Sequence, residues 1–366
     1  MDDSDSILID DLKVSSYKIP TDLHEADGTI SWDSTTMVLV EIKGGGKTGI
    51  GYTYGHEATG IIIEKTLKKL VLKKNAMNIE SITSALIRAI RNNGNTGIAM
   101  MAVSAVDNAL WDLKAKIFDV PLCSLLGQAK DEMLIYGSGG FTSYNDKQLE
   151  NQLGGWASEG IRYVKMKIGT HPADDVSRVK KAREAIGKNT GLFVDANGAY
   201  TVKQALGKAR SFAEYDVSWY EEPVTSDNLQ GLCFIREHAP YKMNIAAGEY
   251  GYNLPYFDKM IHQGAVDILQ ADATRCGGIS YYIKAGNLAE AYEIPFSSHC
   301  APALHLHASV TLKNFYIGEY FYDHVRIEKM LFDGVMPSKN GCLVPDLQRA
   351  GVGLEFKHSD AEKYKI

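Results

Sequence analysis

Six short segments that end in charged residues limit what this chain can fold into more than any other feature. They are YVKMKIG around Lys167, FVDANG around Asp195, WYEEP around Glu221, AAGEYG around Glu249, ILQADATRCGG around Asp272 and PFSSHCAP around His299. Runs of β-branched and aromatic residues that end in charges at a Gly or Pro are typical of buried parallel strands whose C-terminal tips form a site. The segments recur at intervals of roughly two to three dozen residues, the length of a βα unit. The chain is therefore predicted to be an α/β protein with a functional site at one end of its strands.

The composition is that of an ordinary globular protein. A chain of 366 residues with 45% hydrophobic content can bury a large core, as one barrel or as two domains. The net charge of -6 is mild and no stretch is strongly basic, so we expect neither nucleic acid nor a membrane surface as a partner. Five scattered cysteines without CxxC spacing and an acidic N-terminus without an apolar signal segment favour a cytoplasmic location.

The hydrophobic pattern divides the chain into three parts. Residues 7–54 alternate as strands and predict a small antiparallel sheet, and residues 78–118 carry apolar side chains at helical spacing. Pro121 and Gly127 mark a boundary, after which strands and helices alternate. We therefore expect an α+β domain over residues 1–125, a barrel over 126–331 and a C-terminal segment over 332–366 that folds back on the first domain.

The second part contains eight strand candidates. They are MLIYGSGGF, YVKMKIG, GLFVDANG, VSWYEEPV, NIAAGEY, VDILQADA, IPFSSHC and FYIGEYF, separated by helical stretches such as ADDVSRVKKAREAI and SYYIKAGNLAEAY. The simplest closed architecture for eight βα units is a (β/α)8 barrel, with its site at the C-terminal ends of the strands.

The charged residues at the strand tips indicate metal-assisted chemistry. Side chains alternate along a strand, so Lys165 and Lys167 face the same side. Charges inside a barrel are costly unless they neutralise one another or bind a cation. Asp195, Glu221 and Glu249, one carboxylate from each of three successive strands, form a hard oxygen set suited to Mg²⁺.

Two candidate bases accompany these carboxylates. Lys167 is one, because a second ammonium group at Lys165 is expected to lower its pKa toward neutrality. His299 is the other, and Asp272 at the preceding strand tip is placed to hold its imidazole in one tautomer. Glu319, on the last strand, could hydrogen-bond a substrate carboxylate if it were protonated.

These residues, in this order, resemble the enolase superfamily and specifically its mandelate racemase subgroup. The resemblance covers nearly the whole chain, from an N-terminal capping domain to the closing segment, and also implies a homo-oligomer. It implies metal ligands at Asp195, Glu221 and Glu249, a base at Lys167 assisted by Lys165, a dyad of His299 and Asp272, and a carboxylic acid at Glu319. Alternation along a strand predicts that only one residue of the adjacent pair in WYEEP faces the barrel. The family pattern favours Glu221, with Glu222 as the alternative.

The resemblance implies abstraction of the proton next to a carboxylate. Dehydration of an acid sugar, an aldonate or an aldarate, to a 2-keto-3-deoxy acid is the favoured activity. Racemisation or epimerisation of a 2-hydroxy acid is the first alternative, and a non-catalytic sugar-acid binding protein is the second. The motifs alone do not decide between loss of water and simple proton transfer.

Substrate choice in the superfamily comes from two loops of the capping domain. Here these are expected at residues 20–32 and 51–57, and we expect His24, Tyr54 and, from the barrel, Asn197 to contact the substrate. Cys300 follows His299, but alternation along a strand predicts that their side chains point apart. His305 and His307 lack partners at zinc spacing and are interpreted as structural.

Overall fold

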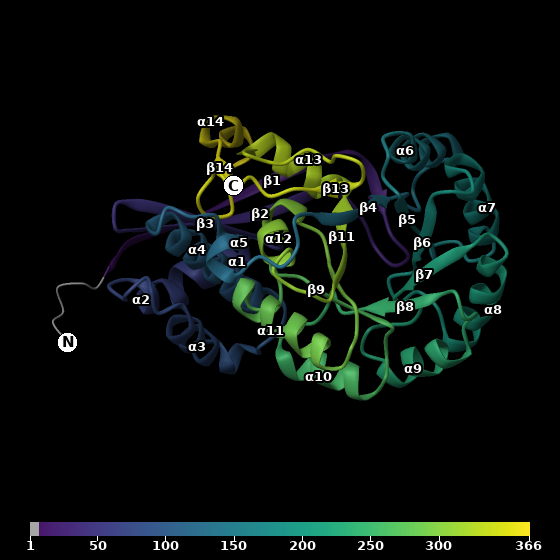
Figure 1. Ribbon diagram of the computed structural model, residues 1–366, viewed down its shortest axis with the longest axis horizontal. Helices are drawn as coiled ribbons and strands as arrows, with labels where there is room; N and C mark the ends of the chain where they lie inside the picture. Colours follow the sequence, from purple (N-terminus) through teal and green to yellow (C-terminus); the bar gives the residue numbers. More distant parts are fainter. Residues whose placement is uncertain (1–6) are drawn as a thin grey trace.

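The computed structural model describes residues 7–366 (Figure 1). The first part of the fold is an antiparallel sheet. Its strands are β1 (Ile9–Ala26), β2 (Ser31–Gly44) and β3 (Lys47–Tyr54), paired in the order β1-β2-β3. Gly45 and Gly46 form the tight β2–β3 hairpin turn, with φ of 58° and 72°, a conformation that glycine adopts without strain. The alternating N-terminal pattern therefore folds as the predicted sheet.

Helices cover this sheet and complete the N-terminal unit. They are α1 (Ala58–Ile62), the π-helical turn η2 (Ile63–Leu67), α2 (Lys68–Val71), α3 (Ile79–Ala89), the short 3-10 helix η3 (Arg91–Asn93), α4 (Gly97–Ile117) and α5 (Leu122–Leu126). Helix α4 is buried along almost its whole length, because it packs against β3 on one side and the barrel helix α11 (Gly278–Ala291) on the other. This explains why its sequence is apolar all round rather than on one stripe.

Eight parallel strands form a closed barrel. They are β4 (Met133–Gly139), β5 (Tyr163–Lys167), β6 (Gly191–Asp195), β7 (Val217–Glu221), β8 (Asn244–Ala247), β9 (Ile268–Ala271), β10 (Phe296–Ser298) and β11 (Phe315–Phe321). Pairing between β11 and β4 closes the ring. The register places Lys167 beside Asp195 and Asp195 beside Glu221, so three charged side chains occupy one layer at the strand tips. The predicted barrel with an N-terminal α+β unit is confirmed.

Helices follow the barrel strands on the outside of the barrel, and α6 to α9 are visible on the right of Figure 1. They are α6 (Asp146–Ser158), α7 (Asp175–Ile186), α8 (Val202–Ala213), α9 (Leu229–His238), α10 (Leu254–His262), α11, α12 (Pro302–Ser309) and α13 (Tyr322–Leu331). Local sequence sets several of their starts. Asn145 and Thr201 each form a capping box, with Gln148 and Gln204 respectively, which satisfies amide groups at the helix ends.

The C-terminal residues contact both the N-terminal sheet and the barrel. They include β12 (Phe332–Asp333), β13 (Cys342–Leu343), β14 (Glu355–Phe356), α14 (His358–Ala361) and the 3-10 turn η4 (Glu362–Tyr364). The amide of Ile366 donates to the carbonyl of Ser16 at 3.0 Å, whereas β13 pairs with β4. This segment therefore ties the two larger parts together.

Polar side chains of α4 hold the barrel segment that follows β9. Asp107 accepts hydrogen bonds from the Ser280 amide and hydroxyl, and Asn108 binds the carbonyl of Ala273 and the amide of Ile279. Because these groups are buried, each hydrogen bond also avoids the cost of an unpaired polar atom. The N-terminal unit thereby helps to position the loop that begins at Asp272.

An aromatic cluster fills the barrel below the charged layer. Phe193 stacks on Trp219 with ring centroids 5.0 Å apart, and Tyr136 packs against both rings. The Trp219 indole donates to Glu221 at 2.9 Å, which joins this apolar floor to the charged residues above it. Over residues 7–366, no helix is both long enough and apolar enough to cross a membrane.

Candidate active site

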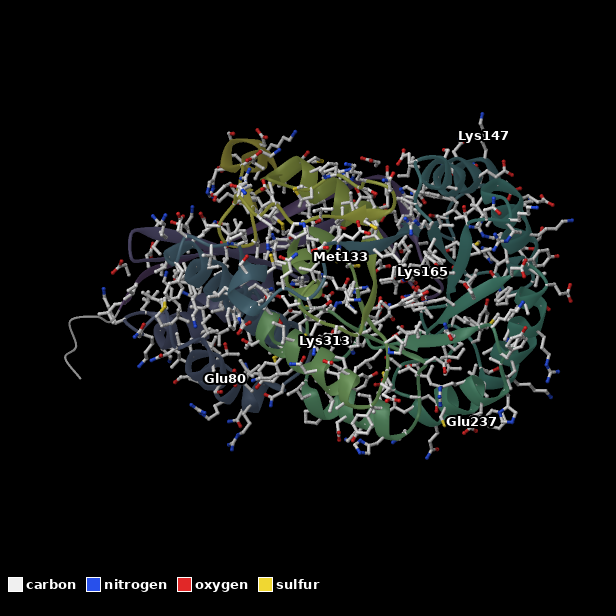
Figure 2. The ribbon with its side chains drawn as sticks, viewed as in Figure 1. Glu80, Met133, Lys147, Lys165, Glu237 and Lys313 are labelled. Carbon is white, nitrogen blue, oxygen red and sulfur yellow. The ribbon has the colours of Figure 1, made fainter. Side chains whose placement is uncertain are left out.

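The charged strand tips converge inside the barrel, as the sequence predicted. Figure 2 shows Lys165 within the barrel, whereas Lys147 and Glu237 project from the outer helices. The side chains of Lys165, Asp195 and Glu221 are completely buried. Ordinary barrel layers are apolar, so the buried charged side chains of this one indicate a chemical function.

Three carboxylates form a compact cluster at the strand ends. Oxygen atoms of Asp195, Glu221 and Glu249 lie within 4.8 Å of one another. Asp195 accepts a hydrogen bond from the Asn197 amide at 2.9 Å, which orients one of its oxygens. The donor set consists only of hard oxygens, the type that Mg²⁺ prefers.

The cluster contains oxygen atoms that the protein itself does not satisfy. Oε2 of Glu249 and Oε1 of Glu222 are buried and accept no hydrogen bond. Buried carboxylate oxygens without partners are costly. A divalent cation fits these residues, because it would be coordinated by carboxylate oxygens that accept no hydrogen bond from the described residues 7–366.

Glu222 corrects the expectation that only one residue of the adjacent pair faces the barrel. Strand β7 ends at Glu221, and Glu222 has a φ of 38°, in the left-handed region. The alternation rule does not apply beyond the strand end, and Glu222 is only 1% exposed. Burial, followed by the charges of Glu249 and Asp195, raises the pKa of Glu222 well above its ordinary value.

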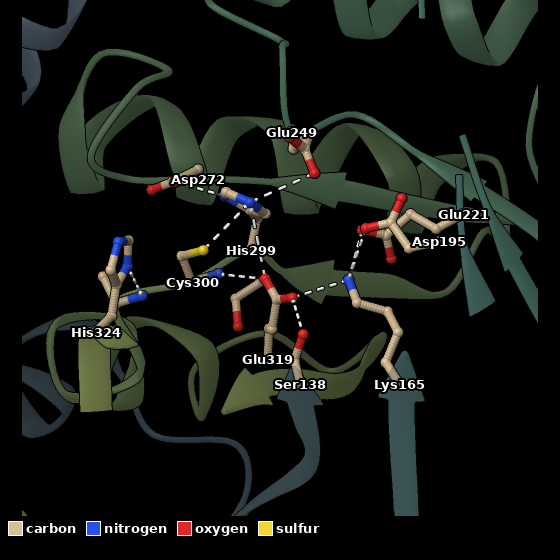
Figure 3. A network of polar contacts seen from close by, with 12 residues as sticks. Ser138, Lys165, Asp195, Glu221, Glu249, Asp272, His299, Cys300, Glu319 and His324 are labelled. Atoms are coloured by element: carbon tan, nitrogen blue, oxygen red, sulfur yellow. Dashed lines mark hydrogen bonds and ion pairs between the residues drawn. The ribbon is translucent and has the colours of Figure 1, made fainter. Parts of the chain in front are cut away.

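The two lysines lie on one side of the cluster. Nζ of Lys167 contacts Oδ2 of Asp195 at 2.5 Å, and Nζ of Lys165 lies 2.5 Å from Oε1 of Glu221 and 2.8 Å from Oε1 of Glu319. Lys167 borders the open cavity, whereas Lys165 is fully buried. Figure 3 shows Lys165 in contact with the carboxylates around it.

The expected lowering of the Lys167 pKa is wrong for this arrangement. Burial and the neighbouring Lys165 do lower the pKa of Lys167, but the contact with Asp195 outweighs them. The pKa of Lys167 therefore lies above its ordinary value. The prediction considered the like charge two residues away and not the carboxylate on the adjacent strand.

His299 lies on the opposite side, as the second candidate base. Its Nδ1 donates to Oδ2 of Asp272 at 2.8 Å, and its Nε2 lies 3.4 Å from Oε2 of Glu249 (Figure 3). Burial raises the pKa of Asp272, but hydrogen bonding and charge from His299 lower it further, so Asp272 is an anion. This anion orients the imidazole and leaves Nε2 directed into the site.

Further contacts fix Asp272 in place. Its Oδ1 accepts from the Thr274 amide at 2.7 Å, and the Arg275 side chain lies 3.7 Å from its Oδ2. His305 accepts from the Ala273 amide at 2.8 Å and donates from its other nitrogen to the Ala301 carbonyl. His305 thus braces the two loops that carry the dyad.

The structure also differs from the expectation that the side chains of Cys300 and His299 point apart. Strand β10 ends at Ser298, and Cys300 and Ala301 have φ of 51° and 37°. This turn brings Sγ of Cys300 to 3.2 Å from Nε2 of His299 (Figure 3). Burial, followed by the charge of Glu319, raises the pKa of the Cys300 thiol well above its ordinary value, so it remains a neutral thiol.

Glu319 is ionised rather than protonated. Burial raises its pKa, but the charges of Lys165, His299 and Lys167 lower it more. Its oxygens accept hydrogen bonds from the Ser138 hydroxyl at 2.6 Å and the Cys300 amide at 2.8 Å (Figure 3). In this structure Glu319 is therefore a counter-ion for Lys165, and the expectation of a carboxylic acid is not met.

A cavity of about 370 Å³ lies between the cluster and the N-terminal unit. Among the predicted substrate contacts, Tyr54 and Asn197 line it. His24 does not, because its side chain is exposed and only its backbone carbonyl is used, by Ser143. Much of the first predicted loop is strand: β1 continues to Ala26, and the connection to β2 spans only residues 27–30.

The sequence reasoning did not name several residues that line this cavity, although two of them, Asp27 and Trp32, lie within the predicted loop at residues 20–32. They are Asp27, Trp32, Thr35, Arg275, Phe321 and His324. Arg275 stands three positions after Asp272, within a segment already singled out, so its proximity to the strand tip was a usable signal. His324 and Thr35 come from parts of the chain with no motif, and only the folding of the N-terminal sheet over the barrel brings them together.

Comparison with protein families gives two matches that together cover most of the chain. Residues 14–127 match the N-terminal domain of mandelate racemase and muconate lactonizing enzymes, and residues 148–361 match the enolase C-terminal domain-like family. Arabinonate dehydratase of Saccharolobus solfataricus is 30% identical over 343 residues, 90% of each chain. A 3,6-anhydro-alpha-L-galactonate cycloisomerase of Streptomyces coelicolor is 31% identical, over 96% of this chain and 98% of that protein.

Solved structures agree with these matches. A mandelate racemase/muconate lactonizing enzyme-like protein from Rubrobacter xylanophilus is 48% identical with a TM-score of 0.96, covering 98% of this chain and 100% of that one. A racemase from Streptomyces coelicolor with bound magnesium is 30% identical with a TM-score of 0.93, at the same coverage. A magnesium-bound relative and the carboxylate cluster here together bear out the expectation of Mg²⁺ as cofactor.

Proposed function

We propose, from the premise that this chain belongs to the mandelate racemase and muconate lactonizing enzyme family of the enolase superfamily, that it dehydrates an acid sugar to a 2-keto-3-deoxy acid. Its relatives include acid-sugar dehydratases and cycloisomerases, all of them enzymes. We propose that Asp195, Glu221 and Glu249 hold Mg²⁺. When bound there, the ion would stabilise the negative charge that develops on the substrate carboxylate as the α-proton leaves.

One observation carries the proposal: two basic groups flank the carboxylate cluster. Around the barrel, Lys167 on β5 precedes the three carboxylates, and His299 after β10 follows them. Both side chains border the same cavity. A substrate carboxylate held at the cluster would therefore present its α-carbon between two bases, an arrangement that simple binding would not require.

Dehydration needs a base at C2 and an acid at C3. One of the two basic groups removes the C2 proton, and the configuration at C2 decides which one. His299 is suited to protonate the leaving C3 hydroxyl, because an imidazolium ion is a much stronger acid than an ammonium ion. The C3 hydroxyl leaves as water, the C2–C3 double bond forms, and the resulting enol rearranges to the 2-keto-3-deoxy acid.

Proton NMR in D2O with Mg²⁺ and pooled aldonic and aldaric acids tests this proposal. The expected result is the signal of a 2-keto-3-deoxy acid, with deconvolution of the pool to identify the substrate. Exchange or inversion at C2 without loss of water would make the protein a racemase or epimerase instead. An isomerised lactone or anhydro sugar would point to cycloisomerisation, the activity of a relative that is 31% identical.

Matched variants separate the enzyme from a sugar-acid binder. Lys167→Ala and His299→Asn should each abolish turnover, and Lys147→Ala on the exposed face of α6 is the control that should not. A ligand that binds to the unchanged protein with no exchange and no product would favour the binding protein. Full turnover in excess EDTA would contradict the metal assignment.

A further inference from the structure

The two ends of the cavity differ in charge. The end formed by the barrel carries the carboxylate cluster with Lys167 and His299. A second group of lining residues, which we call the cap wall, comes from the N-terminal unit and from α13: Asp27, Ile30, Trp32, Thr35, Tyr54 and His324. A substrate held by its carboxylate at the cluster in this cavity would contact the cap wall with the rest of its chain.

Tyr54 and His324 form the centre of the cap wall as uncharged hydrogen-bonding groups. Their rings are stacked with centroids 3.6 Å apart, and the Tyr54 hydroxyl is buried without a hydrogen-bond partner. Nδ1 of His324 accepts from the Ala301 amide at 3.4 Å, which leaves the proton on Nε2. Burial, followed by the charge of His299, lowers the pKa of His324 to about 3, so the ring is neutral near pH 7.

The cations that border the cavity are already paired or lie elsewhere. Arg275 contacts Oε1 of Glu249 at 3.5 Å and Oδ2 of Asp272 at 3.7 Å. Lys167 is paired with Asp195 at the barrel end. His56 is exposed at the cavity mouth, where its Nδ1 accepts from a backbone amide. None of these groups offers the cap wall a free positive charge.

The cap wall instead carries a carboxylate. Oδ1 of Asp27 accepts hydrogen bonds from the amides of Thr29 and Ile30, at 2.6 Å and 2.8 Å. These bonds fix the orientation of the Asp27 carboxylate at the cap wall. A second carboxylate on the substrate would therefore meet a like charge in a partly desolvated cavity, which is strongly unfavourable.

The loop that bears Asp27 is held against the barrel. The Asp27 carbonyl accepts from the Thr142 hydroxyl at 2.8 Å and from the Thr170 hydroxyl. A Cβ on Gly28 would lie 2.4 Å from the Ala196 carbonyl oxygen, so only glycine permits this close approach. The loop that carries Asp27 is therefore held in place by the barrel. The charges of the cap wall are in position before a substrate binds.

We propose that the substrate is a monocarboxylic acid sugar, an aldonate, whose uncharged polyol end binds the cap wall. Tyr54 and His324 donate hydrogen bonds to its distal hydroxyls, and Asp27 disfavours the second carboxylate of an aldarate. This inference rests on the proposed function. It narrows the substrate from acid sugars in general to those with a single carboxylate.

Matched acid pairs test this inference. The probes are aldonates and the aldarates of the same configuration, such as gluconate with glucarate and galactonate with galactarate, each assayed with Mg²⁺ by product NMR and by thermal shift. For the configuration the protein accepts, kcat/KM should favour the aldonate by about 10-fold or more, and the aldonate should give the larger thermal shift. Equal or larger values for the aldarate would overturn the inference and leave dehydration intact.

A pair of variants makes the test independent of the natural preference. Ile30 is 62% exposed, so Ile30→Lys adds a cation to the cap wall without disturbing a core, and Ile30→Gln is the uncharged control. Ile30→Lys should narrow the aldonate-to-aldarate ratio, whereas Ile30→Gln should leave it unchanged. An unchanged ratio in both variants would count against the inference.

The binding measurement also separates the two proposals. Thermal shifts with aldonates but not with aldarates, without exchange or product, would support the preference for one carboxylate and contradict the proposed dehydratase activity. No shift and no reaction with either class would overturn both.

Discussion

The barrel end of the cavity and the cap wall differ in how many charged groups they contain. At the barrel end, charged groups stand within about 4 Å of one another, as in the contacts of Lys165 with Glu221, Glu319 and Asp195. At the cap wall, the polar groups other than Asp27 are uncharged, and the Tyr54 hydroxyl has no hydrogen-bond partner among residues 7–366. The barrel end can therefore move protons and hold a cation, whereas the cap wall is suited to recognise the hydroxyl groups and the charge of the distal part of a substrate.

Two buried carboxyl groups near the cap wall add little charge to it. Burial, followed by the charge of Asp323, raises the pKa of Glu25 to about 8, and its Oε2 accepts from the Trp32 indole at 2.8 Å. Burial likewise raises the pKa of Glu328 to about 8. Near pH 7 both carboxyls are mostly protonated. The comparison teaches that the chemistry and the choice of substrate are carried by different parts of the chain.

The largest expected effect is at the two bases. Lys167→Ala and His299→Asn should each lower kcat by about 10²- to 10⁴-fold, the usual contribution of a general acid or base. Deuterium exchange at C2 and product formation measure the two half-reactions separately. A variant that keeps exchange but loses dehydration identifies the residue that protonates the leaving hydroxyl. Wild-type rates in both variants would contradict the assignment of the chemistry to the barrel end.

Loss of the orienting carboxylate should have the next largest effect. In Asp272→Asn the amide can donate to Nδ1 of His299, which favours the tautomer with its proton on Nε2 and removes the base from the cavity. We expect kcat to fall by about 10²-fold or more, with unchanged circular dichroism. Thr274→Ser, which keeps the amide that binds Asp272, should retain activity.

Magnesium should stabilise the barrel end measurably. At a concentration 100 times its Kd, a ligand that binds only the folded state contributes about 2.7 kcal/mol, which is visible as a rise in Tm. Glu249→Gln should weaken this rise, because it removes a charge from the cluster. Glu237→Gln, on the exposed surface of α9, is the control. A rise of equal size in Glu249→Gln would contradict the assignment of this ligand.

The cap wall should respond in KM rather than in kcat. Tyr54→Phe removes one hydrogen-bond donor, a change of about 1 kcal/mol, so KM for the accepted aldonate should rise roughly 3- to 10-fold. The phenyl ring preserves the stack on His324, which makes this variant a test of the hydroxyl alone. A fall in kcat as large as that of Lys167→Ala would show that the cap wall takes part in the chemistry.

The smallest effect concerns the pH dependence of stability. The raised pKa of Glu328 means that the unfolded chain loses this proton first, near its ordinary pKa of about 4.3. Its contribution is therefore complete below that pH and is lost as pH rises toward 8. Glu328→Gln should flatten the fall of Tm between pH 5 and 8, measured by thermal unfolding without substrate. An unchanged slope would show that Glu328 is not the titrating group.

The order of the motifs along the chain was enough to predict the barrel and most of its charged layer. Side-chain alternation and the βα repeat are local properties, so sequence could place Lys167, Asp195 and Glu221 at the strand tips and Lys165 on the same face of its strand as Lys167. The same local rule failed where strands end. Glu222 and Cys300 lie one or two residues past their strands with positive φ, and there the side-chain direction depends on the turn.

Tertiary structure alone decided the charges and the shape of the site. The pKa of Lys167 depends on Asp195 of the neighbouring strand, and that of Glu319 depends on Lys165, which is distant in sequence. The cap wall joins Tyr54 and His324 from opposite ends of the chain. Electrostatic interactions act through space, so sequence by itself determined which charged groups the site contains, and the fold determined which of them neutralise one another.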